Sequence, residues 1–496
     1  MDIFIEKLSL FFKGLGQKIV DWFVNLGKKI KAFFLGLPDF FVNLGKKIAN
    51  GAKNYVNNFR EGDLGVKFSY LFMGAGAFAH GQIIKGIGYL AIELLFIFYM
   101  IFNGAGALAG LFTLGTEFTY TYYNVDGGSG MEVNVAGDNS MLCLLYGVVA
   151  LIVIVAFLIV YFMNIKSAVA NHQDSIIGKK PNSFKQDFLN LFDKKFYAVL
   201  LGAAMVGVIA FTILPLVFMI LIAFTNYDSA HPETSGFSWT GFETFGQLIG
   251  TTGLSSTFFP VLGWTLLWAL CATFLNYFLG VGLALLINNK NVKGKKVWRT
   301  FFVLTIAIPQ FVSLLLMRSM LGQYGPIMNM LVEMGLPRTD WFQSTNAARL
   351  IVILVNLWIG IPYSMLITSG ILMNIPKDLY ESARIDGAGS LKMFQKITLP
   401  YIMFVTGPYL ITQFIGNINN FNVIFLLTGG APFGTLPDGS AGSTSLLVTW
   451  LYKLTTETAD YNLASAIGIL TFLVCSIVSL ITYKNTSSMK NEEDFQ

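Results

Sequence analysis

Glu381-Ser-Ala-Arg-Ile-Asp386-Gly387-Ala388, followed by Phe394, Ile397, Leu399 and Pro400, is the stretch of the chain that decides its fold. It lies between two apolar segments, at about 348–374 and 399–428, each long enough to cross a bilayer. Residues 377–385 contain no helix breaker, and Gly387 can adopt a positive φ that turns the chain. Because proline disfavours helix at the residue before it, a second short helix is expected to end near Pro400. The stretch therefore predicts a helical hairpin that joins two membrane spans.

The composition is that of a membrane protein. The 496 residues are 54% hydrophobic and 12% charged, with a mean hydropathy of +0.62, which excludes an ordinary soluble globular protein. Apolar segments of the length that a spanning helix needs lie at about 84–103, 141–163, 198–224, 261–288, 299–321, 348–374, 399–428 and 464–484. We therefore expect an all-α polytopic membrane protein with eight spans.

Basic residues orient these spans. Lys and Arg concentrate in the N-terminal arm, in 164–197, in 289–299, in the hairpin at 376–400 and in the C-terminal tail. Only Arg318, Arg338, Arg349 and Lys453 fall on the opposite side. By the positive-inside rule, both termini and the hairpin are expected to be cytoplasmic in a multi-pass cell-membrane protein. The formal net charge of +5 reflects this orientation and does not indicate nucleic-acid binding.

The hairpin resembles the EAA loop of bacterial ABC importer permeases, E-A-A-x-x-D-G-A-x-x-x-x-x-F-x-x-I-x-L-P, with Ser382 as the departure. The resemblance implies that 376–400 is a coupling loop that docks on an ATPase subunit, through Glu381, Ala383, Asp386, Gly387 and Ala388. It also implies a type I permease core of six spans at 198–490, preceded by two further spans within 64–197. The sequence has no Walker A pattern, catalytic motif or metal signature. ATP and Mg are therefore expected on the partner ATPase, and no cofactor is expected in this chain.

Two spans that flank the hairpin each carry a polar face at helical spacing. The residues before it are Asn356, Ile359, Gly360 and Tyr363, and those after it are Gln413, Gly416, Asn417 and Asn420. Amide side chains both donate and accept hydrogen bonds, as sugar hydroxyls do. The same residues could instead hydrogen-bond between helices and hold the bundle together. From the residues alone, a sugar site and a structural role are equally supported.

These segments, 356–363 and 417–421, and the continuation 426–432, are similar to the larger, MalF-like permease subunits of maltose/maltodextrin importers. The resemblance implies that the eight residues of the two polar faces line a sugar site midway across the membrane, and that transport proceeds by alternating access. It implies four kinds of partner: a second permease subunit, two ATPase subunits, an extracellular sugar-binding protein and an oligosaccharide. Gly416 and Gln413 depart from the enterobacterial pattern, where an aromatic residue and a serine stand. Another oligosaccharide, such as a galacto-oligosaccharide, therefore remains an alternative.

The N-terminal arm, residues 1–63, contains an internal repeat. Phe23-Val-Asn-Leu-Gly-Lys-Lys-Ile30 recurs as Phe41-Val-Asn-Leu-Gly-Lys-Lys-Ile48, a period of 18 residues that equals five helical turns. Apolar residues interleaved with paired lysines are typical of helices in an anionic membrane interface. We expect an amphipathic cytoplasmic arm here, followed by a second interfacial stretch at 64–83.

Glu93, near the middle of the first predicted span, is the one residue that favours a rival class. An intramembrane carboxylate is a candidate for ion coupling, so a proton- or sodium-coupled sugar transporter is an alternative function. That class would need the charge beside the substrate face and would not need the hairpin at 376–400. The ATP-driven importer therefore remains the main prediction.

Overall fold

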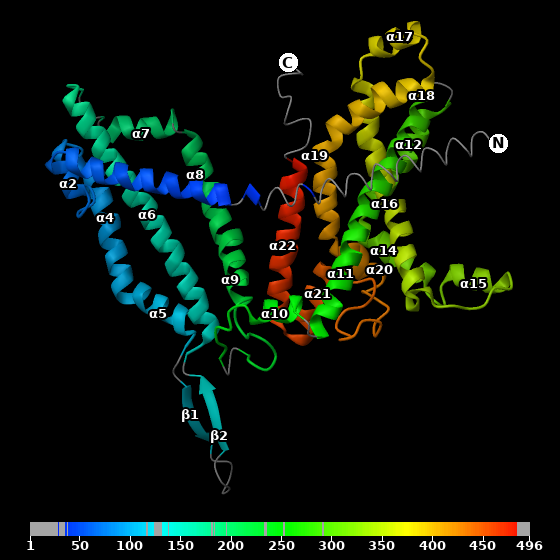
Figure 1. Ribbon diagram of the computed structural model, residues 1–496, viewed down its shortest axis with the longest axis horizontal. Helices are drawn as coiled ribbons and strands as arrows, with labels where there is room; N and C mark the ends of the chain where they lie inside the picture. The colour runs from blue at the N-terminus through cyan, green and yellow to red at the C-terminus, as the bar shows by residue number, and fades with distance from the viewer. Residues whose placement is uncertain are drawn as a thin grey trace. The chain divides into compact units, whose positions relative to one another are not determined.

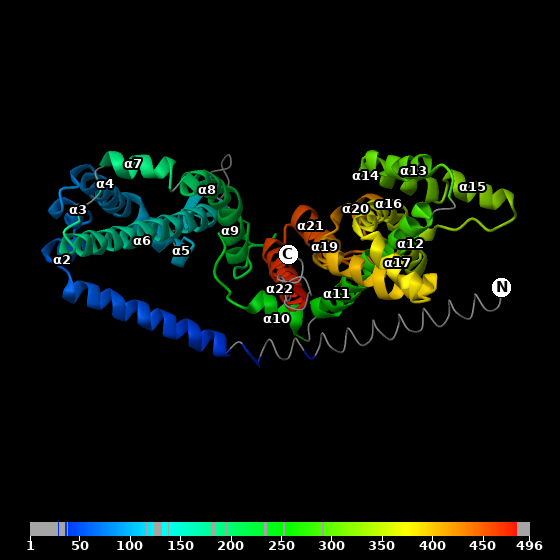
Figure 2. The same ribbon diagram turned by 90° about the horizontal axis from the view of Figure 1, so that it is seen from above.

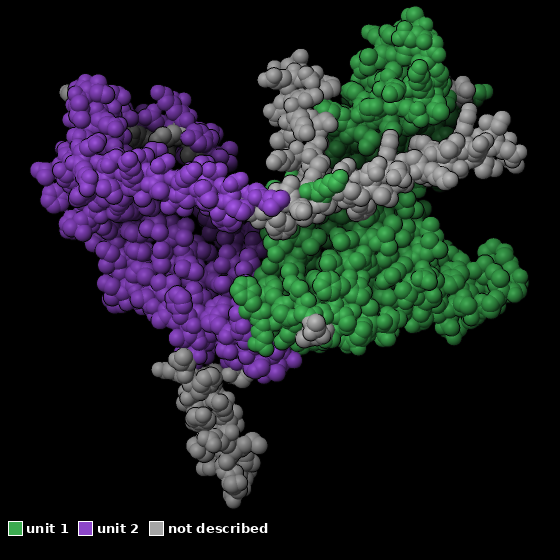
Figure 3. All heavy atoms as spheres, viewed as in Figure 1, with its two compact units in different colours: residues 1–31, 242–496 green, residues 32–241 purple. Residues whose placement is uncertain are grey.

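A computed structural model describes residues 28, 35–36, 38–115, 118–123, 131–136, 138–179, 182, 184–194, 196–232, 236–250, 253–289 and 292–483. The chain divides into two compact units, coloured separately in Figure 3. Unit 1 comprises residues 1–31 and 242–496, and unit 2 comprises residues 32–241. The first copy of the octapeptide repeat lies outside the described residues, apart from Lys28.

Unit 2 begins with a helix over 38–61, which runs crosswise to α4 in Figures 1 and 2. The following elements are α2 (Leu64–Ser69), α3 (Ala75–Ala79), α4 (Ile83–Tyr99), the π-helical turn η1 (Met100–Gly104), α5 (Ala105–Thr113), strands β1 (Phe118–Tyr123) and β2 (Met131–Ala136), α6 (Ser140–Ile176), α7 (Phe184–Phe192), α8 (Phe196–Val208), η2 (Ile209–Ile213) and α9 (Leu214–Ile222). The antiparallel hairpin of β1 and β2 pairs Phe118 with Ala136 and is an addition to the predicted helical fold.

Polar side chains from α4 and α6 fix the turn between α2 and α3. The Oε2 atom of Glu93 accepts a hydrogen bond from the backbone N–H of Met73 at 2.8 Å. Asn164 of α6 accepts from the Gly74 N–H at 2.9 Å and donates to the Ser69 carbonyl at 3.1 Å. Glu93 therefore binds the turn between α2 and α3, which gives this intramembrane carboxylate a structural contact.

Unit 1 contains the remaining helices. They are α10 (Glu243–Ile249), α11 (Gly253–Leu270), η3 (Cys271–Leu275), α12 (Asn276–Asn288), α13 (Lys295–Ala307), α14 (Gln310–Leu321), α15 (Pro326–Glu333), η4 (Trp341–Gln343), α16 (Thr345–Asn374), α17 (Lys377–Ile385), α18 (Ser390–Met393), η5 (Phe394–Thr398), α19 (Leu399–Ile418), α20 (Phe421–Leu427), α21 (Leu447–Lys453), η6 (Leu454–Thr458) and α22 (Tyr461–Tyr483). The core joins α11, α14, α16 and α20 through Trp264, Trp268, Leu314, Val352, Val355, Val423, Ile424 and Leu427.

In the described part of the chain, seven helices are long and apolar enough to cross a membrane. They cover 83–113, 140–176, 199–222, 253–288, 345–374, 390–427 and 461–480. The predicted span at 299–321 is a bent pair of helices, because α13 and the segment Gln310–Glu333 meet at an angle of 89°. The break falls at Pro309, which forces Ile308 out of the helical region to φ −79° and ψ 126°. With this bent pair counted as one span, the all-α fold with eight spans is confirmed.

The predicted division of the chain at residue 198 follows hydropathy and remains a prediction. By packing, α9 lies against α6, so that the compact units divide between residues 241 and 242. Hydropathy identifies each span, but it does not indicate which helices pack together, and this packing assigns a span to a unit.

Candidate functional site

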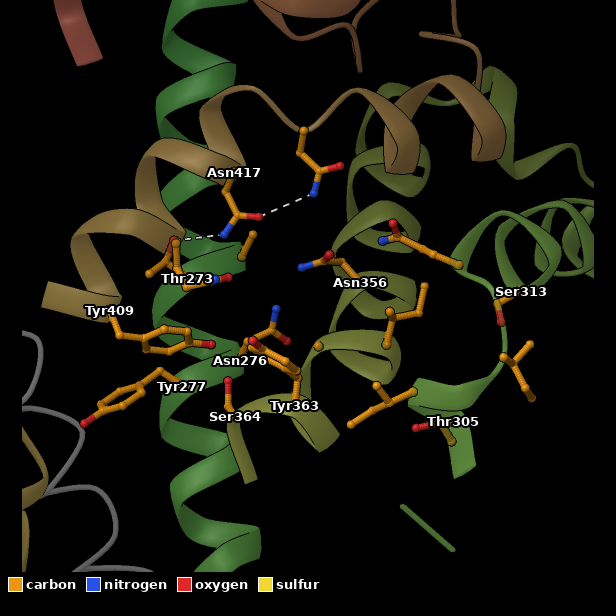
Figure 4. A pocket seen from close by; sticks show the side chains of 18 of the residues that line it. Thr273, Asn276, Tyr277, Thr305, Ser313, Asn356, Tyr363, Ser364, Tyr409 and Asn417 are labelled. Atoms are coloured by element: carbon orange, nitrogen blue, oxygen red, sulfur yellow. Dashed lines mark hydrogen bonds between the residues drawn. The ribbon is translucent and has the colours of Figure 1, made fainter. Parts of the chain in front are cut away.

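A cavity of about 390 Å³ lies within unit 1 (Figure 4), between the continuous helix α16 and helices that break or change helix type beside it. This volume falls in the range of small-molecule sites, which is roughly 300–1,000 Å³. The lining residues come from η3 and α12, the α13–α14 break, α16 and the α19–α20 junction, and they are Ala272, Thr273, Asn276, Tyr277, Thr305, Ile306, Ala307, Ile308, Pro309, Gln310, Ser313, Asn356, Ile359, Gly360, Tyr363, Ser364, Tyr409, Leu410, Gln413, Asn417 and Asn420. None of these described residues is charged, so the cavity suits a neutral polar solute.

Two breaks between helices expose polar groups to the cavity. Pro309 leaves the backbone at 308–309 outside any helix, and this backbone lines the cavity. The side chain of Asn420 accepts from the Val423 N–H at 3.3 Å and so caps the start of α20. Irregular backbone at membrane depth is tolerated where it lines a cavity, which is the arrangement found here.

One side of the cavity is a fixed hydrogen-bonded network. The Asn417 amide donates to Thr273 Oγ1 at 3.0 Å, and Asn420 donates to Asn417 Oδ1 at 3.4 Å. Figure 4 marks both interactions as dashed lines. Trp268 donates from its indole N–H to the Asn417 carbonyl at 3.1 Å. Asn417 and Asn420 are therefore partly satisfied within the protein, as the structural role considered from the sequence requires.

The other side carries two amides with unused hydrogen-bonding capacity. Neither Nδ2 of Asn356 nor Oδ1 of Asn276 has a hydrogen-bond partner among the described residues, although both atoms are buried. In Figure 4 both side chains point into the same space. A buried polar group without a partner costs about 1–3 kcal/mol. A ligand that accepts from Asn356 and donates to Asn276 would satisfy both, and a hydroxyl group can do either.

Gly360 makes room for the Asn276 amide. A Cβ atom at position 360 would lie 2.6 Å from Asn276 Cγ, well inside van der Waals contact. A similar close approach occurs one turn further along α16, where a Cβ at Gly280 of α12 would lie 2.9 Å from the Met365 N. Small residues thus allow α12 and α16 to approach closely, as in other membrane helix pairs.

Aromatic rings form an apolar wall. The rings of Tyr363 and Tyr409 lie with centroids 6.3 Å apart and are tilted by 39°. Tyr277 is buried and its hydroxyl lies 2.6 Å from Thr406 Oγ1. A pyranose has an apolar face and a rim of hydroxyls, so a site with tyrosine rings and unpaired amides matches both parts of it.

The structure brings most of the predicted site residues together. Asn356, Ile359, Gly360, Tyr363, Gln413, Asn417 and Asn420 all line the cavity, whereas Gly416 does not. Sequence reasoning missed Asn276, Thr273 and the α13–α14 break. Thr273 and Asn276 lie at i and i+3 in an apolar span, and Pro309 interrupts another, so a search for polar residues or proline in every span could have found them.

The predicted coupling loop protrudes as a helical hairpin made of α17 and α18. Gly387 has the expected positive φ, +73°, and the Ala388 N–H closes the turn on the Ala383 carbonyl at 2.8 Å. Glu381, Asp386 and Gly387 are exposed, while Ala383 and Ala388 are half-buried. The Tyr380 hydroxyl lies 2.8 Å from Thr398 Oγ1 and ties α17 to the start of the following span.

The expected end of a helix near Pro400 is wrong. Residues 390–418 are continuously helical, and the π-helical turn η5 at Phe394–Thr398 precedes α19. Leu399 keeps helical angles, φ −65° and ψ −46°. Pro400 lies just after this π-helical turn, at the point where the backbone hydrogen bonds change from the i→i−5 to the i→i−4 pattern. The hairpin is therefore continuous with the span that carries Gln413, Asn417 and Asn420.

Within the described residues, no group of three or more His, Cys, Asp or Glu side chains could hold a metal ion. The described lining of the cavity consists of neutral hydrogen-bond donors, acceptors and aromatic rings.

A membrane-spanning bundle with a neutral polar cavity and a protruding helical hairpin defines a transport permease. The chain belongs to the family described as binding-protein-dependent transport system inner membrane component, which matches residues 276–488. It is 35% identical to the galactooligosaccharides transport system permease protein GanP of Bacillus subtilis (strain 168), over 84% of this chain and 96% of the relative.

It is also 34% identical to the maltodextrin transport system permease protein MdxF of Bacillus subtilis (strain 168), over 85% of this chain and 95% of the relative. The maltose/maltodextrin transport system permease protein MalF of Escherichia coli (strain K12) is 36% identical over 50% of this chain and 49% of its own length. Among solved structures, a bacterial alginate ABC transporter in complex with an alginate pentasaccharide-bound periplasmic protein has a chain that is 24% identical, with a TM-score of 0.50, covering 61% of this chain and 97% of that chain. This likeness supports the fold alone.

Proposed function

We propose that this chain is a permease subunit of an ATP-driven importer of neutral oligosaccharides, with maltodextrin as the main candidate substrate. The observation that carries the proposal is the cavity in unit 1, where a buried amide donor on Asn356 and a buried amide acceptor on Asn276 lack protein partners. The uncharged lining favours a neutral sugar, and relatives named as maltodextrin permeases favour the α-glucan class.

Galacto-oligosaccharides are the second candidate, because GanP is 35% identical over most of both chains. Both sugars offer pyranose faces and hydroxyls, so the unpaired amides alone do not choose between them. An ion-coupled mechanism is less favoured, because Glu93 binds the Met73 backbone and does not line the cavity.

In the proposed mechanism, the chain works with a second permease subunit, two ATPase subunits that bind ATP and Mg, and an extracellular sugar-binding protein. The hairpin at 376–400 contacts the ATPase in the cytoplasm, where both termini also lie, as the distribution of Lys and Arg indicates. Because η5 and α19 continue from the hairpin without a break, a displacement of α17 and α18 would reach Gln413 and Asn417 through one helix. This continuous link supports alternating access to the sugar cavity.

Alanine variants of the two unpaired amides test the proposal. Asn276→Ala and Asn356→Ala each remove an atom that has no protein partner, so folding should be little affected. Loss of about 1 kcal/mol of sugar binding would lower uptake about fivefold at low sugar concentration, below saturation. Uptake of labelled malto- and galacto-oligosaccharides should be measured in proteoliposomes that contain the assembled complex.

Asn419→Ala is the matched control. Asn419 is an exposed amide at the same helix end as Asn417, but it does not line the cavity. Its variant should transport at the rate of the unmodified complex. If Asn276→Ala and Asn356→Ala also transport every tested sugar at that rate, the cavity is not the sugar site.

A further inference from the structure

The helix over 38–61 carries a stripe of five apolar residues along one side, which Phe40 and Val42 widen at its N-terminal end. At 100° per residue, Phe41, Leu44, Ile48, Tyr55 and Phe59 fall within about 60° of one another around the helix. Asn43, Lys46, Asn50, Lys53 and Asn54 lie on the remaining arc. We call the five apolar residues the arm stripe.

Only the C-terminal end of the arm stripe packs on other rings of the protein, and there Tyr55 is half-buried while Phe59 stays 45% exposed. The Tyr55 ring packs against Tyr70 at a centroid distance of 4.7 Å and against Phe162 at 6.1 Å, and Phe59 packs against Tyr70 at 5.2 Å. The Tyr55 hydroxyl lies 3.0 Å from the Tyr161 hydroxyl, and Tyr70 donates to the Tyr55 carbonyl at 2.8 Å. These contacts fix the rotation of the helix about its own axis.

On the N-terminal side of Tyr55, the residues of the arm stripe are exposed to solvent. The exposed fractions of Phe41, Leu44 and Ile48 are 62%, 42% and 65%. A helix that packs one end of an apolar stripe on its own fold and leaves three large apolar residues uncovered must meet another apolar phase there.

The point at which the arm contacts α6 indicates which apolar environment surrounds the exposed residues of the arm stripe. Tyr55 contacts α6 at Tyr161 and Phe162, which end the apolar run at 141–163. The next turns of α6 carry Asn164, Lys166 and His172. The arm therefore meets α6 where a spanning helix passes from hydrocarbon to polar surroundings, and it runs crosswise to α4 there (Figure 1).

We propose that the helix over 38–61 lies in the plane of an anionic phospholipid interface, with Phe41, Leu44 and Ile48 inserted among the acyl chains. Four cations, Lys46, Lys47, Lys53 and Arg60, stand against two carboxylates on this helix, Asp39 and Glu61. Lysine stems can extend from the flanks of such a helix to the lipid phosphates while the apolar face stays buried. The cationic excess selects an anionic surface.

Spin labels on the full-length chain test the proposal. The three native cysteines, Cys143, Cys271 and Cys475, are first replaced by serine. Single labels are then introduced at 41, 44 and 48 on the stripe, and at 43, 50 and 54 off it. The labelled protein is studied in nanodiscs of phosphatidylcholine alone and in nanodiscs of equal parts phosphatidylcholine and phosphatidylglycerol.

In the mixed nanodiscs, labels on the arm stripe should collide with oxygen and be shielded from a water-soluble nickel chelate, at a depth of about 5–10 Å. Labels off the stripe should show the reverse. Lys46→Glu/Lys47→Glu/Lys53→Glu should abolish the alternation, whereas the same three lysines changed to arginine should keep it.

Three outcomes would overturn the proposal. Access of the nickel chelate to all six positions would place the arm in water. Shielding of the stripe from both reagents would assign it to a protein partner. An equal alternation in nanodiscs of phosphatidylcholine alone would remove the requirement for anionic lipid.

Discussion

At the scale of single residues, Gly360 is the sharpest test of the site geometry. A methyl group at this position would collide with the Asn276 amide, whose acceptor oxygen has no protein partner. Gly360→Ala should therefore displace Asn276 and lower sugar uptake about fivefold, for a loss of about 1 kcal/mol. The change should not weaken the fold, because alanine favours helix over glycine by up to about 1 kcal/mol.

Gly370→Ala is the control for this substitution, since it lies in the same helix and its methyl group would meet nothing within 4 Å. Uptake by Gly370→Ala should equal that of the unmodified complex. The double variant Gly360→Ala/Asn276→Ala should lose no more uptake than Asn276→Ala alone, because both changes act through one amide. Additive losses would show that Gly360 acts in some other way.

A residue of this site could be predicted from the sequence when two conditions were met. It had to lie on a polar face at helical spacing, and its span had to flank the hairpin at 376–400. Asn356 and Tyr363 satisfy both, since they precede the hairpin on one face of a span. Asn276 does not, because it follows the π-helical turn η3 in a different span. Its contact with Gly360 crosses between helices, and no local pattern contains such a contact.

At the scale of elements, the turn between α17 and α18 depends on Gly387. Its φ of +73° lies in the left-handed region, and a methyl group would meet nothing within 4 Å, so the cost of substitution is conformational. A β-branched residue there costs at least about 1–2 kcal/mol. We expect Gly387→Val to distort the hairpin and to reduce ATP hydrolysis stimulated by the sugar-loaded binding protein, without loss of membrane insertion.

Gly389→Ala provides the comparison, because Gly389 has a φ of −70° and equally open surroundings. This variant should retain full stimulation. Gly387→Asn should be intermediate, since asparagine tolerates positive φ better than valine does. Full stimulation of the Gly387→Val complex would contradict a coupling role for the turn.

Prolines show where element boundaries can be predicted and where they cannot. Pro309 breaks a span, as its effect on the preceding residue suggests, yet the resulting angle of 89° depends on the packing of α14 against α20. Pro400 has the opposite outcome, because the preceding π-helical turn lets the chain continue as a helix. The positions of prolines thus indicate where a helix can break. Tertiary packing determines at which of these positions the chain bends.

At the scale of the whole molecule, hydropathy and charge predicted the class and the spans, because burial in lipid acts on each helix separately. The partition into units could not be predicted in this way. The arm is the clearest case: the predicted range of 1–63 is uniform in composition, but its last turns pack on α2 and α6 through Tyr55 and Phe59. The contacts with α6 join residues about one hundred positions apart in the chain, as Tyr55 and Tyr161 do.

Two truncations separate the free part of the arm from its packed end. Deletion of residues 2–53 should leave sugar-stimulated ATP hydrolysis close to that of the full chain, because Tyr55 and Phe59 keep their contacts. Deletion of 2–60 removes both rings and the Tyr55–Tyr161 and Tyr55–Tyr70 hydrogen bonds, and should destabilise unit 2 by on the order of 2–3 kcal/mol. Thermal unfolding of the assembled complex in nanodiscs measures the loss of stability in the 2–60 deletion, and ATP hydrolysis measures the activity of the 2–53 deletion.

If the complex with the 2–53 deletion assembles but loses its stimulated activity, the free arm is a working part of the transporter. If the two truncations unfold at the same temperature, the tyrosine cluster does not anchor the arm.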